Sequence, residues 1–433
     1  MFLSLIYNLV LLLFFILYMP VLLFKVLTGK ADQVREQLGF LPRTLLNVLN
    51  NETVFWVHGV SVGETVAAGP VCAEIRKQFP QAKIVFSTVT TTGRVMAEKL
   101  IPADSFFYFP FDLPVVVKKV LVRLKPALVV IMETELWPNF IKTAHQMGCK
   151  VVLANGRISD QSFRRYRLLG AFFRDMLNRF AALIMQSPQD VDYVLALGAD
   201  PKRVYHYGNT KYDLKLAPDG QGAGGTLARE LQLDGASPIL VAGSTHANEE
   251  EMLIPLYRRL KTEFPDLVMI LAPRHPERVK EIEPLYQKAG IPTVRRTELK
   301  NRNARRTAPV IFLDTIGELL SVYGLADLVF VGGSLVKFGG HNILEPAASG
   351  RTIFVGPHMD DFKDILRLFL NHDACIQVQD ADELADKMLY YLNNKEAAAE
   401  KGRNALRIVR ANQGATEKVV RLLSSLLAGK EAD

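Results

Sequence analysis

Apolar runs of strand length alternate with helix-length segments along most of the chain. In the first half these runs are "TVFWVHGV", "KIVFSTVT", "ALVVIMETE", "KVVLANGRIS", "ALIMQS" and "RVYHYGNT". In the second half they are "PILVAGST", "LVMILAPRH", "PVIFLD", "ADLVFVGGS", "TIFVGP" and "CIQVQD". Each run is rich in β-branched residues, and periodic stretches such as "EEEMLIPLYRRLKTEF" lie between them. This βαβα alternation predicts an α/β fold with parallel sheets that helices cover on both faces.

The alternation stops once, between residues 214 and 237. The segment "LKLAPDGQGAGGTLARELQLDGAS" is rich in glycine and polar residues and shows no clear strand, so we interpret it as a linker. A chain of 433 residues is also too long for one compact core. We therefore predict two Rossmann-like domains that face a cleft, at residues 25–213 and 238–433. The second ends in an amphipathic helix, "QGATEKVVRLLSSLLAG", which packs back on either domain.

The N-terminal segment is long and apolar. Residues 2–24, "FLSLIYNLVLLLFFILYMPVLLF", carry no charge, and a helix of this length crosses a hydrocarbon core of roughly 30 Å. The segment lacks the basic start and the cleavage site of a secretory signal. Basic residues follow it directly: Lys25, Lys30, Arg35 and Arg43. Residues 1–24 are therefore predicted to be a single uncleaved anchor that spans the membrane and leaves the remaining chain in the cytoplasm. The alternative is a helix kinked at Pro20 that lies along the membrane interface.

The overall charge is mildly basic. The sequence has 52 Lys and Arg against 45 Asp and Glu, a net charge of +7, which fits a solvated surface or attraction to lipid headgroups or nucleic acid. It has no basic run interleaved with aromatic residues and no zinc-finger spacing, so nucleic acid is not expected as a partner. The cysteines Cys72, Cys149 and Cys375 lie far apart, which is typical of buried thiols in a reducing compartment.

In the first half, polar residues stand at strand ends, where α/β proteins position ligands. In "SVGE", Ser61 and Glu64 have the spacing of a helix capping box. Glu64 is therefore either a capping residue or a general base at a helix start. His58, at the end of the preceding strand, is a second candidate base.

Two more first-half motifs carry charge toward the predicted cleft. Glu133 and Glu135 in "IMETELWPN" are two residues apart and point to the same face, so they are expected to pair with a cation or take part in chemistry. Lys211 in "GNTKYD" directly precedes the linker. It is either an ordinary solvent lysine or a residue that reaches the cleft.

In the second half, a glycine-rich loop follows the strand "ADLVFV". In "GGSLVKFGGHNILEPAASG", residues 332–350, we expect a helix to begin near His341. Glycines let backbone N–H groups approach an anion, and a helix N-terminus favours one. Asn342 and Glu345 would share one face of that helix, where the carboxylate accepts ribose hydroxyls or merely caps. The spacing is not GxGxxG and no P-loop occurs in the sequence, so neither dinucleotide binding nor a P-loop is predicted.

Three other strand ends of the second half carry candidate ligand-binding residues. Arg274 suits phosphate, although a surface arginine is somewhat more common at such a strand end. Ser244 and Thr245 hold a phosphate or cap the next helix. Gly317 and Glu318 are candidates for contact with a base or a ribose.

Together these motifs resemble one family, the Kdo (3-deoxy-D-manno-octulosonic acid) transferases of lipopolysaccharide synthesis. The segments that carry the resemblance are "HGVSVGET", "METELWPN", "GNTKYD", "STHANEEE", "PRHPER", "DTIGEL" and "FVGGSLVKFGGHNILEPAA". The resemblance implies the GT-B fold and an inverting, metal-independent transfer of Kdo from CMP-Kdo to a lipid A precursor. It places the enzyme at the cytoplasmic face of the inner membrane, in contact with its lipids, with CMP-Kdo as co-substrate and no cofactor. The DxD at Asp190 and Asp192 falls at a predicted helix start, where it caps rather than binds metal.

The resemblance also implies roles for individual residues. Glu64 would be the general base, and Glu133 and Lys211 would stabilise the transition state. The CMP moiety would be bound by Pro273, Arg274, Ile316, Gly317, Glu318, Asn342, Ile343, Leu344 and Glu345. Gly59 departs from the family pattern, in which we expect Ser or Ala, and this affects the shape of the acceptor pocket. The alternatives to a transferase are a nucleotide-sugar epimerase or hydrolase of the same fold, or a non-catalytic membrane-anchored nucleotide-sugar binder.

Overall fold

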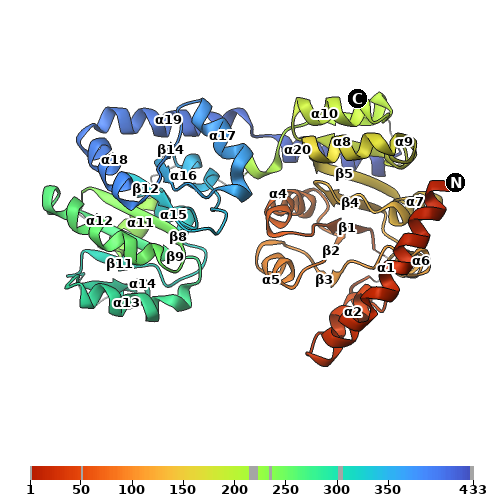
Figure 1. The fold of residues 1–433 in the computed structure, drawn as a ribbon, viewed down its shortest axis with the longest axis horizontal. Coiled ribbons are helices and arrows are strands. Elements are labelled where there is room, and N and C mark those ends of the chain that lie inside the picture. Colours follow the sequence, from red (N-terminus) through yellow and green to blue (C-terminus); the bar gives the residue numbers. More distant parts are fainter. Residues whose placement is uncertain (1, 50–51, 214–222, 234–236, 301–305, 430–433) are drawn as a thin grey trace. The chain divides into compact units, whose positions relative to one another are not determined.

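A computed structural model of the chain describes residues 2–49, 52–213, 223–233, 237–300 and 306–429. The chain divides into two compact units (Figure 1). Unit 1 comprises Met1–Asp213 and Asn412–Asp433, and unit 2 comprises Leu214–Ala411. Each unit has its own parallel sheet and its own helices. The predicted α/β class with two Rossmann-like domains is confirmed.

Unit 1 is built on a sheet that, within the described residues, has seven strands in the order β3-β2-β1-β4-β5-β6-β7. The strands are β1 (Val54–His58), β2 (Lys83–Thr88), β3 (Ser105–Tyr108), β4 (Leu128–Met132), β5 (Lys150–Gly156), β6 (Ala182–Met185) and β7 (Val204–His206). All neighbouring strands are parallel. The helices are α1 (Phe2–Leu27), α2 (Ala31–Gln37), α3 (Arg43–Val48), α4 (Val62–Gln78), α5 (Thr91–Leu100), α6 (Pro114–Leu124), α7 (Pro138–Gln146), α8 (Asp160–Leu168), α9 (Gly170–Leu177), α10 (Pro188–Ala196), η1 (Pro201–Arg203), η2 (Thr210–Tyr212) and α20 (Ala415–Leu427).

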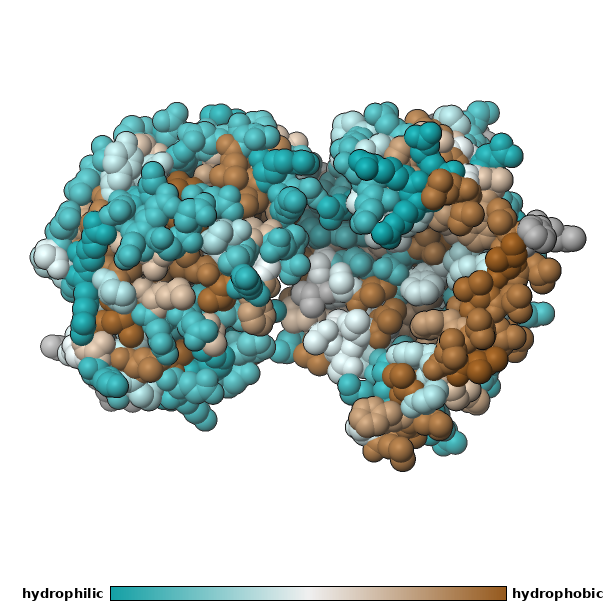
Figure 2. All heavy atoms as spheres, viewed as in Figure 1, coloured by the Kyte–Doolittle hydropathy of each residue, from teal (hydrophilic) through white to brown (hydrophobic). Residues whose placement is uncertain are grey.

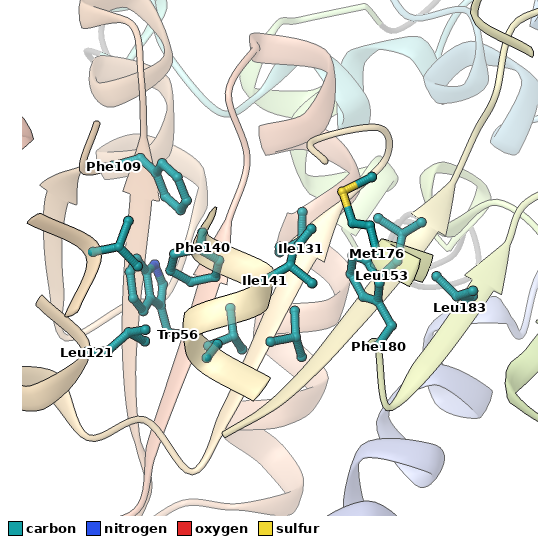
Figure 3. Close-up of a cluster of buried hydrophobic side chains, with 14 of the residues drawn as sticks. Trp56, Phe109, Leu121, Ile131, Phe140, Ile141, Leu153, Met176, Phe180 and Leu183 are labelled. Atoms are coloured by element: carbon teal, nitrogen blue, oxygen red, sulfur yellow. The ribbon is translucent and has the colours of Figure 1, made fainter. Parts of the chain in front are cut away.

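Both faces of this sheet are buried, which explains why its strands are continuous apolar runs. On one face Trp56 packs against Phe140 (Figure 3), with the two rings 5.0 Å apart. Trp56 also packs against Phe107. The Trp56 indole N–H donates to Ser87 Oγ at 2.7 Å, so this buried polar atom is satisfied. On the other face Phe55, next to Trp56 in the strand, belongs to a second core that helices α4 and α20 cover.

Unit 2 has the same architecture. Its sheet has seven described strands in the order β10-β11-β9-β8-β12-β13-β14. The strands are β8 (Ile239–Thr245), β9 (Val268–Pro273), β10 (Thr293–Arg295), β11 (Val310–Phe312), β12 (Leu328–Val331), β13 (Thr352–Val355) and β14 (Ile376–Gln377), all in parallel pairs. The helices are α11 (Ala223–Glu230), α12 (Glu249–Glu263), η3 (Pro276–Arg278), α13 (Val279–Lys288), α14 (Arg296–Leu299), α15 (Leu319–Tyr323), α16 (Leu344–Ala348), η4 (Asp360–Phe362), α17 (Lys363–Asn371), α18 (Ala381–Asn393) and α19 (Lys395–Ala411).

The boundaries of the units differ from the expected domains in two places. The sequence places the terminal helix α20 in the domain 238–433 and leaves open which domain it packs on. In the structure α20 belongs to unit 1, because Val419 and Leu423 pack into the core beside α4. Part of the expected linker forms the helix α11, in which Leu227 is buried. Residues 214–222 and 234–236 of that linker lie outside the described residues. The strands β3 and β10 were not among the predicted runs.

The topology fixes where ligands can bind in each unit. In unit 1 the strand order reverses between β1 and β4, and in unit 2 it reverses between β8 and β12. Open parallel sheets bind ligands at the carboxyl ends of the strands beside such a reversal. A ligand-binding site is therefore expected in the loops that follow these four strands.

Candidate active site

Glu64 lies in the first turn of α4, directly after β1. The Ser61 hydroxyl, at the N-cap, accepts a hydrogen bond from the Glu64 N–H at 3.3 Å. The Glu64 carboxylate accepts from the Val60 N–H at 2.6 Å and from the Ser61 hydroxyl at 3.2 Å. The predicted capping geometry therefore forms, with the carboxylate bonded to Val60 rather than to the N-cap amide. Capping and a role as a base use the same carboxylate and do not exclude each other.

The environment of Glu64 makes it a stronger base than an ordinary carboxylate. Its side chain is 7% exposed. The pKa of Glu64 is raised from 4.5 to about 7, mainly by burial and also by the negative charges of Glu135 and Glu133, against the lowering effect of the Val60 N–H. Glu135 also has a raised pKa, mainly because of burial. A carboxyl group with a pKa near 7 can accept a proton efficiently at neutral pH.

Glu133 and Lys211 form an ion pair in the same unit. Lys211 Nζ lies 2.6 Å from Glu133 Oε1, and both side chains are less than one-fifth exposed. A Cβ on Gly63 would lie 3.7 Å from Lys211 Nζ, so the ion pair adjoins the first turn of α4. The structure thus brings Glu64, Glu133 and Lys211 together at the β1–β4 reversal. It pairs one of the two predicted acids with a lysine.

Asn155 positions this ion pair, although the sequence analysis did not single it out. Its side-chain amide lies 3.4 Å from Glu133 Oε1, and its carbonyl oxygen accepts from the Thr210 N–H at 3.0 Å. Asn155 is fully buried and has φ +56°, a conformation that asparagine tolerates better than most residues. Glu133 also has a positive φ, of +55°. The only sequence signal was an asparagine followed by glycine at the end of the run "KVVLANG".

The other first-half candidate, His58, is unsuited to act as a base. Its ring is fully buried, stacks on Phe109 at 3.9 Å and hydrogen-bonds Ser87 through Nδ1 at 2.9 Å. Burial lowers its pKa to about 3. Asp190 also has a structural role: its carboxylate accepts from the Ile158 N–H at 2.7 Å, and its own N–H donates to the N-cap Ser187. Asp190 lies at a helix start as predicted, but the residue that caps α10 is Ser187.

In unit 2, the backbone N–H groups of the glycine-rich loop after β12 bind a carboxylate of the protein itself, that of Glu249. The Glu249 carboxylate accepts hydrogen bonds from the N–H groups of Gly333 at 2.7 Å, Ser334 at 3.0 Å and Leu335 at 2.9 Å. It accepts a fourth from His246 at 2.9 Å. Its bonds fix the loop next to β8, and these N–H groups are occupied by Glu249.

Beyond this loop, a group of rings and charges lies between the ends of β8, β9 and β12. The Nε2 atoms of His246 and His341 are 2.7 Å apart, and the exposed Phe338 stacks on His246 at 3.6 Å. The pKa of His246 is lowered to about 4 and that of His341 to about 3, mainly by burial and also by the positive charge of Arg274. One neutral ring therefore donates to the other.

Glu345 and Asn342 lie beside Arg274. Burial raises the pKa of Glu345, while a hydrogen bond from Asn342 and the charge of Arg274 act in the opposite direction. The helix α16 begins at Leu344, not near His341 as expected. Asn342 therefore precedes the helix, and its carbonyl oxygen accepts from the Leu344 N–H at 3.1 Å. The expectation of a shared helical face was wrong, because Asn342 forms a turn instead of a helical residue, yet its amide still lies 3.4 Å from Glu345.

The remaining predicted nucleotide-binding residues differ in their exposure to solvent. Ile316 is 75% exposed and Gly317 has φ +90°, whereas Ile343 and Leu344 are fully buried. Pro273 ends β9 and is buried, next to Arg274.

Glu318 already has partners within unit 2. Its carboxylate binds the buried Arg296, 2.9 Å away, and the Thr315 hydroxyl. Ser244 and Thr245 also have partners: Ser244 bonds Tyr323, and Thr245 donates to Glu250 at 3.0 Å. Neither caps α12, which has Asn248 at its N-cap.

Two Rossmann-like units, each with charged side chains beside the strand-order reversal of a parallel sheet, place the chain in the GT-B class. Residues 32–214 match the family described as 3-deoxy-D-manno-octulosonic-acid transferase (kdotransferase). The 3-deoxy-D-manno-octulosonic acid transferase of Haemophilus influenzae is 33% identical over 376 residues, covering 86% of this chain and 87% of that protein. The transferase of the same name from Chlamydophila psittaci is 32% identical, covering 81% and 80%. The chain belongs to the Kdo transferase family and is a glycosyltransferase.

Solved structures show the same fold at greater distance. The UDP-GlcNAc 2-epimerase of Neisseria meningitidis, bound to UDP-GlcNAc, has a TM-score of 0.56 and 13% identity, covering 86% of this chain and all of that one. This likeness shows the fold alone. The resemblance drawn from the sequence motifs is confirmed by the closer relatives, which set aside the epimerase, hydrolase and non-catalytic alternatives.

Proposed function

We propose that the protein transfers Kdo from CMP-Kdo to a hydroxyl of a lipid A precursor, with inversion at the anomeric carbon and Glu64 as general base. The observation that carries this proposal is the environment of Glu64. It is a carboxyl group with a pKa near 7, at the β1–β4 reversal, in a group that also contains the Lys211–Glu133 ion pair. A purely structural cap would not need two further acids beside it.

In the proposed reaction, Glu64 accepts the proton of the acceptor hydroxyl as its oxygen attacks the anomeric carbon of Kdo. The bond from that carbon to the phosphate oxygen breaks, and CMP leaves as an anion. A cation is needed where negative charge develops, and we assign this role to Lys211, oriented by Glu133. Among the described residues, no three His, Cys, Asp or Glu side chains are placed to hold one metal ion. Metal independence remains a prediction.

The CMP moiety is assigned to unit 2. Arg274 supplies a planar cation suited to phosphate, and Asn342 and Glu345 supply polar groups next to it. Exposed Ile316 and Gly317 are placed for contact with the nucleoside. The buried Pro273, Ile343 and Leu344 are assigned to the same moiety as neighbours of Arg274, Asn342 and Glu345 in the sequence, and Glu318 is assigned as a carboxylate paired with Arg296.

The acceptor is assigned to unit 1, the unit that carries the apolar helix α1. A lipid-linked acceptor shares the membrane surface with such a helix. We therefore place the enzyme at the cytoplasmic face of the inner membrane. The helix segment Leu3–Leu27 is long and apolar enough to cross a membrane.

The test is Glu64→Gln. Glutamine retains an oxygen for the Val60 N–H but cannot take a proton, so the rate of Kdo transfer should fall by roughly 100-fold or more, with thermal stability unchanged or higher. Mass analysis of the product with CMP-Kdo and a tetra-acylated lipid A precursor gives the readout. Glu74→Gln, about three turns further along α4, is the matched control and should keep full activity. Near wild-type transfer by Glu64→Gln would refute the assignment of the base.

A further inference from the structure

One face of α1 is shielded by unit 1 over the whole length of the helix. The residues that are buried or half-buried recur every three or four positions: Leu3, Ser4, Tyr7, Asn8, Leu11, Phe15, Tyr18, Leu22 and Lys25. This spacing is one stripe along a helix. The stripe also contains all the polar residues of the helix from Ser4 to Lys25. The polar side of α1 therefore faces the protein.

The N-terminal half of α1 is joined to unit 1 by a polar network. The Tyr7 hydroxyl donates to Asp112 Oδ2 at 2.8 Å. Asp112, which is 2% exposed, also accepts from the N–H groups of Asn139 and Phe140 at the start of α7. The Asn139 amide donates to Asn8 Oδ1 at 2.7 Å. Two successive residues of α1 thus bind groups more than 100 positions away in the sequence.

Apolar contacts also attach α1 to the rest of unit 1. The rings of Tyr7 and Phe172 are 6.1 Å apart, and those of Phe15 and Phe111 are 5.5 Å apart at a steep angle. Leu22, near the C-terminal end of α1, is only 3% exposed. Contact at Tyr7, Phe15 and Leu22 means that the helix axis runs along the surface of unit 1 rather than away from it (Figure 1).

The opposite face of α1 is a continuous band of exposed apolar side chains (Figure 2). Its large residues are at least 41% exposed: Leu5, Ile6, Leu9, Val10, Leu12, Leu13, Phe14, Ile16, Leu17, Met19, Val21, Leu23, Phe24, Val26 and Leu27. A band of this size on a water-soluble surface is covered by a partner.

Basic residues flank both ends of this band. At the C-terminal end, the exposed Lys30 directly precedes α2. At the other end, Lys142 and Arg179 line a small cavity together with Ser4 and Tyr7. Apolar residues flanked by cations fit a surface of anionic phospholipids.

We propose that α1 lies in the plane of the membrane, fixed to unit 1 by the Asp112 network, with its apolar band inserted among the acyl chains of anionic phospholipids. The spanning arrangement favoured by the sequence would have to release these contacts. It would place Tyr7 and Asn8 in hydrocarbon without their partners and leave the Asp112 carboxylate without the Tyr7 hydroxyl, which is unfavourable. In the plane, the helix holds unit 1 at a fixed height and tilt on the bilayer. This inference does not depend on which sugar or acceptor the enzyme uses.

Cross-linking in the full-length protein tests the proposal. The double variant Asn8→Cys/Asn139→Cys is reconstituted into vesicles of phosphatidylethanolamine and phosphatidylglycerol and treated with a short thiol cross-linker. We expect linkage in most molecules, detected as linked peptides by mass spectrometry. Leu9→Cys/Asn139→Cys is the matched control: Leu9 is 68% exposed and about 100° further round the helix, so it should not link to position 139.

A second pair, Phe15→Cys/Phe111→Cys, tests the same arrangement without disturbing the polar network. A protease-sensitive tag before residue 1 should be cut from the same side of sealed vesicles as unit 2. Absence of linkage in both pairs, in protein that retains its thermal transition, would overturn the proposal, as would a tag protected on the opposite side. Complete linkage of Leu9→Cys between two chains would also overturn it, by showing that a second copy covers the band.

Discussion

At the scale of single residues, Glu64 is a carboxyl group buried close to two others. Burial is the main reason for its raised pKa, and the charges of Glu135 and Glu133 add to it. Because a base acts in its deprotonated form, we predict that kcat/KM rises with pH through about 7 and is level above it. Glu135→Gln removes one like charge, so the midpoint of this profile should move to lower pH. A kcat/KM profile between pH 5 and 9 measures both effects.

The same shift has the opposite sign for stability. The folded pKa lies above the ordinary value of 4.5, so between 4.5 and about 7 the folded state keeps a proton that the unfolded state has lost. Stability from this group therefore falls as the pH rises through that range. Glu64→Gln should remove this dependence on pH. The assignment of Glu64 as the base would be contradicted by a kcat/KM profile whose midpoint is the same in Glu135→Gln as in the wild type. A wild-type midpoint near 4.5 would also contradict it.

Residue roles were predictable where one motif contains both partners. Ser61 and Glu64 are three residues apart, and their cap follows from spacing alone. The Asn155 amide joins Glu133 to the backbone before Lys211, groups that are 22 and 55 positions away from it. No local pattern shows such a contact. The same holds for Glu249, whose neighbours in the sequence are two further glutamates of the same helix end.

At the scale of elements, the loop after β12 depends on one side chain of α12. Glu249→Gln replaces one carboxylate oxygen by an NH₂ group and leaves up to two of the four N–H groups without an acceptor. Each buried N–H without a partner costs about 1–3 kcal/mol, so the unfolding transition of unit 2 should move to lower urea concentration. Glu251→Gln removes the same charge from the same helix turn at an exposed position. It should change stability by no more than about 0.5 kcal/mol. Equal effects of the two variants would show that only helix charge matters.

The helix α20 contributes to the core of unit 1 although the chain passes through unit 2 before reaching it. Leu423 is fully buried beside α4, and the Asp213 carboxylate accepts from the Gly414 and Thr416 N–H groups at 2.6 Å each. We predict that Leu423→Ala lowers the free energy of unfolding of unit 1 by about 2–5 kcal/mol. The exposed Arg421→Ala on the same helix should have little effect. Circular dichroism during urea unfolding measures both, and a loss confined to unit 2 would contradict this packing.

At the scale of the molecule, the alternation of apolar runs was enough to predict two parallel-sheet units. It did not show β3 and β10, because "SFFY" is only four residues long and "TVR" contains one apolar residue. It also left open which unit α20 joins. An amphipathic pattern shows that a helix buries one face but not against what. For the same reason the stripe of α1 could be recognised only once Asp112 and Phe111 were seen beside it.

A division of labour between the units makes a prediction that separates binding from chemistry. If CMP is bound by unit 2, Arg274→Ala should weaken its affinity by about 10- to 100-fold, the effect of losing a charge-assisted hydrogen bond. Glu64→Gln, in unit 1, should leave CMP affinity unchanged while abolishing most transfer. Arg367→Ala, an exposed arginine of unit 2 with a side chain 71% accessible, is the control for loss of charge. Titration calorimetry with CMP measures all three variants. A tenfold loss of CMP affinity in Glu64→Gln would mean that unit 1 binds the nucleotide, and the assignment of Lys211 to the developing negative charge would then have to be rebuilt around direct contact with CMP.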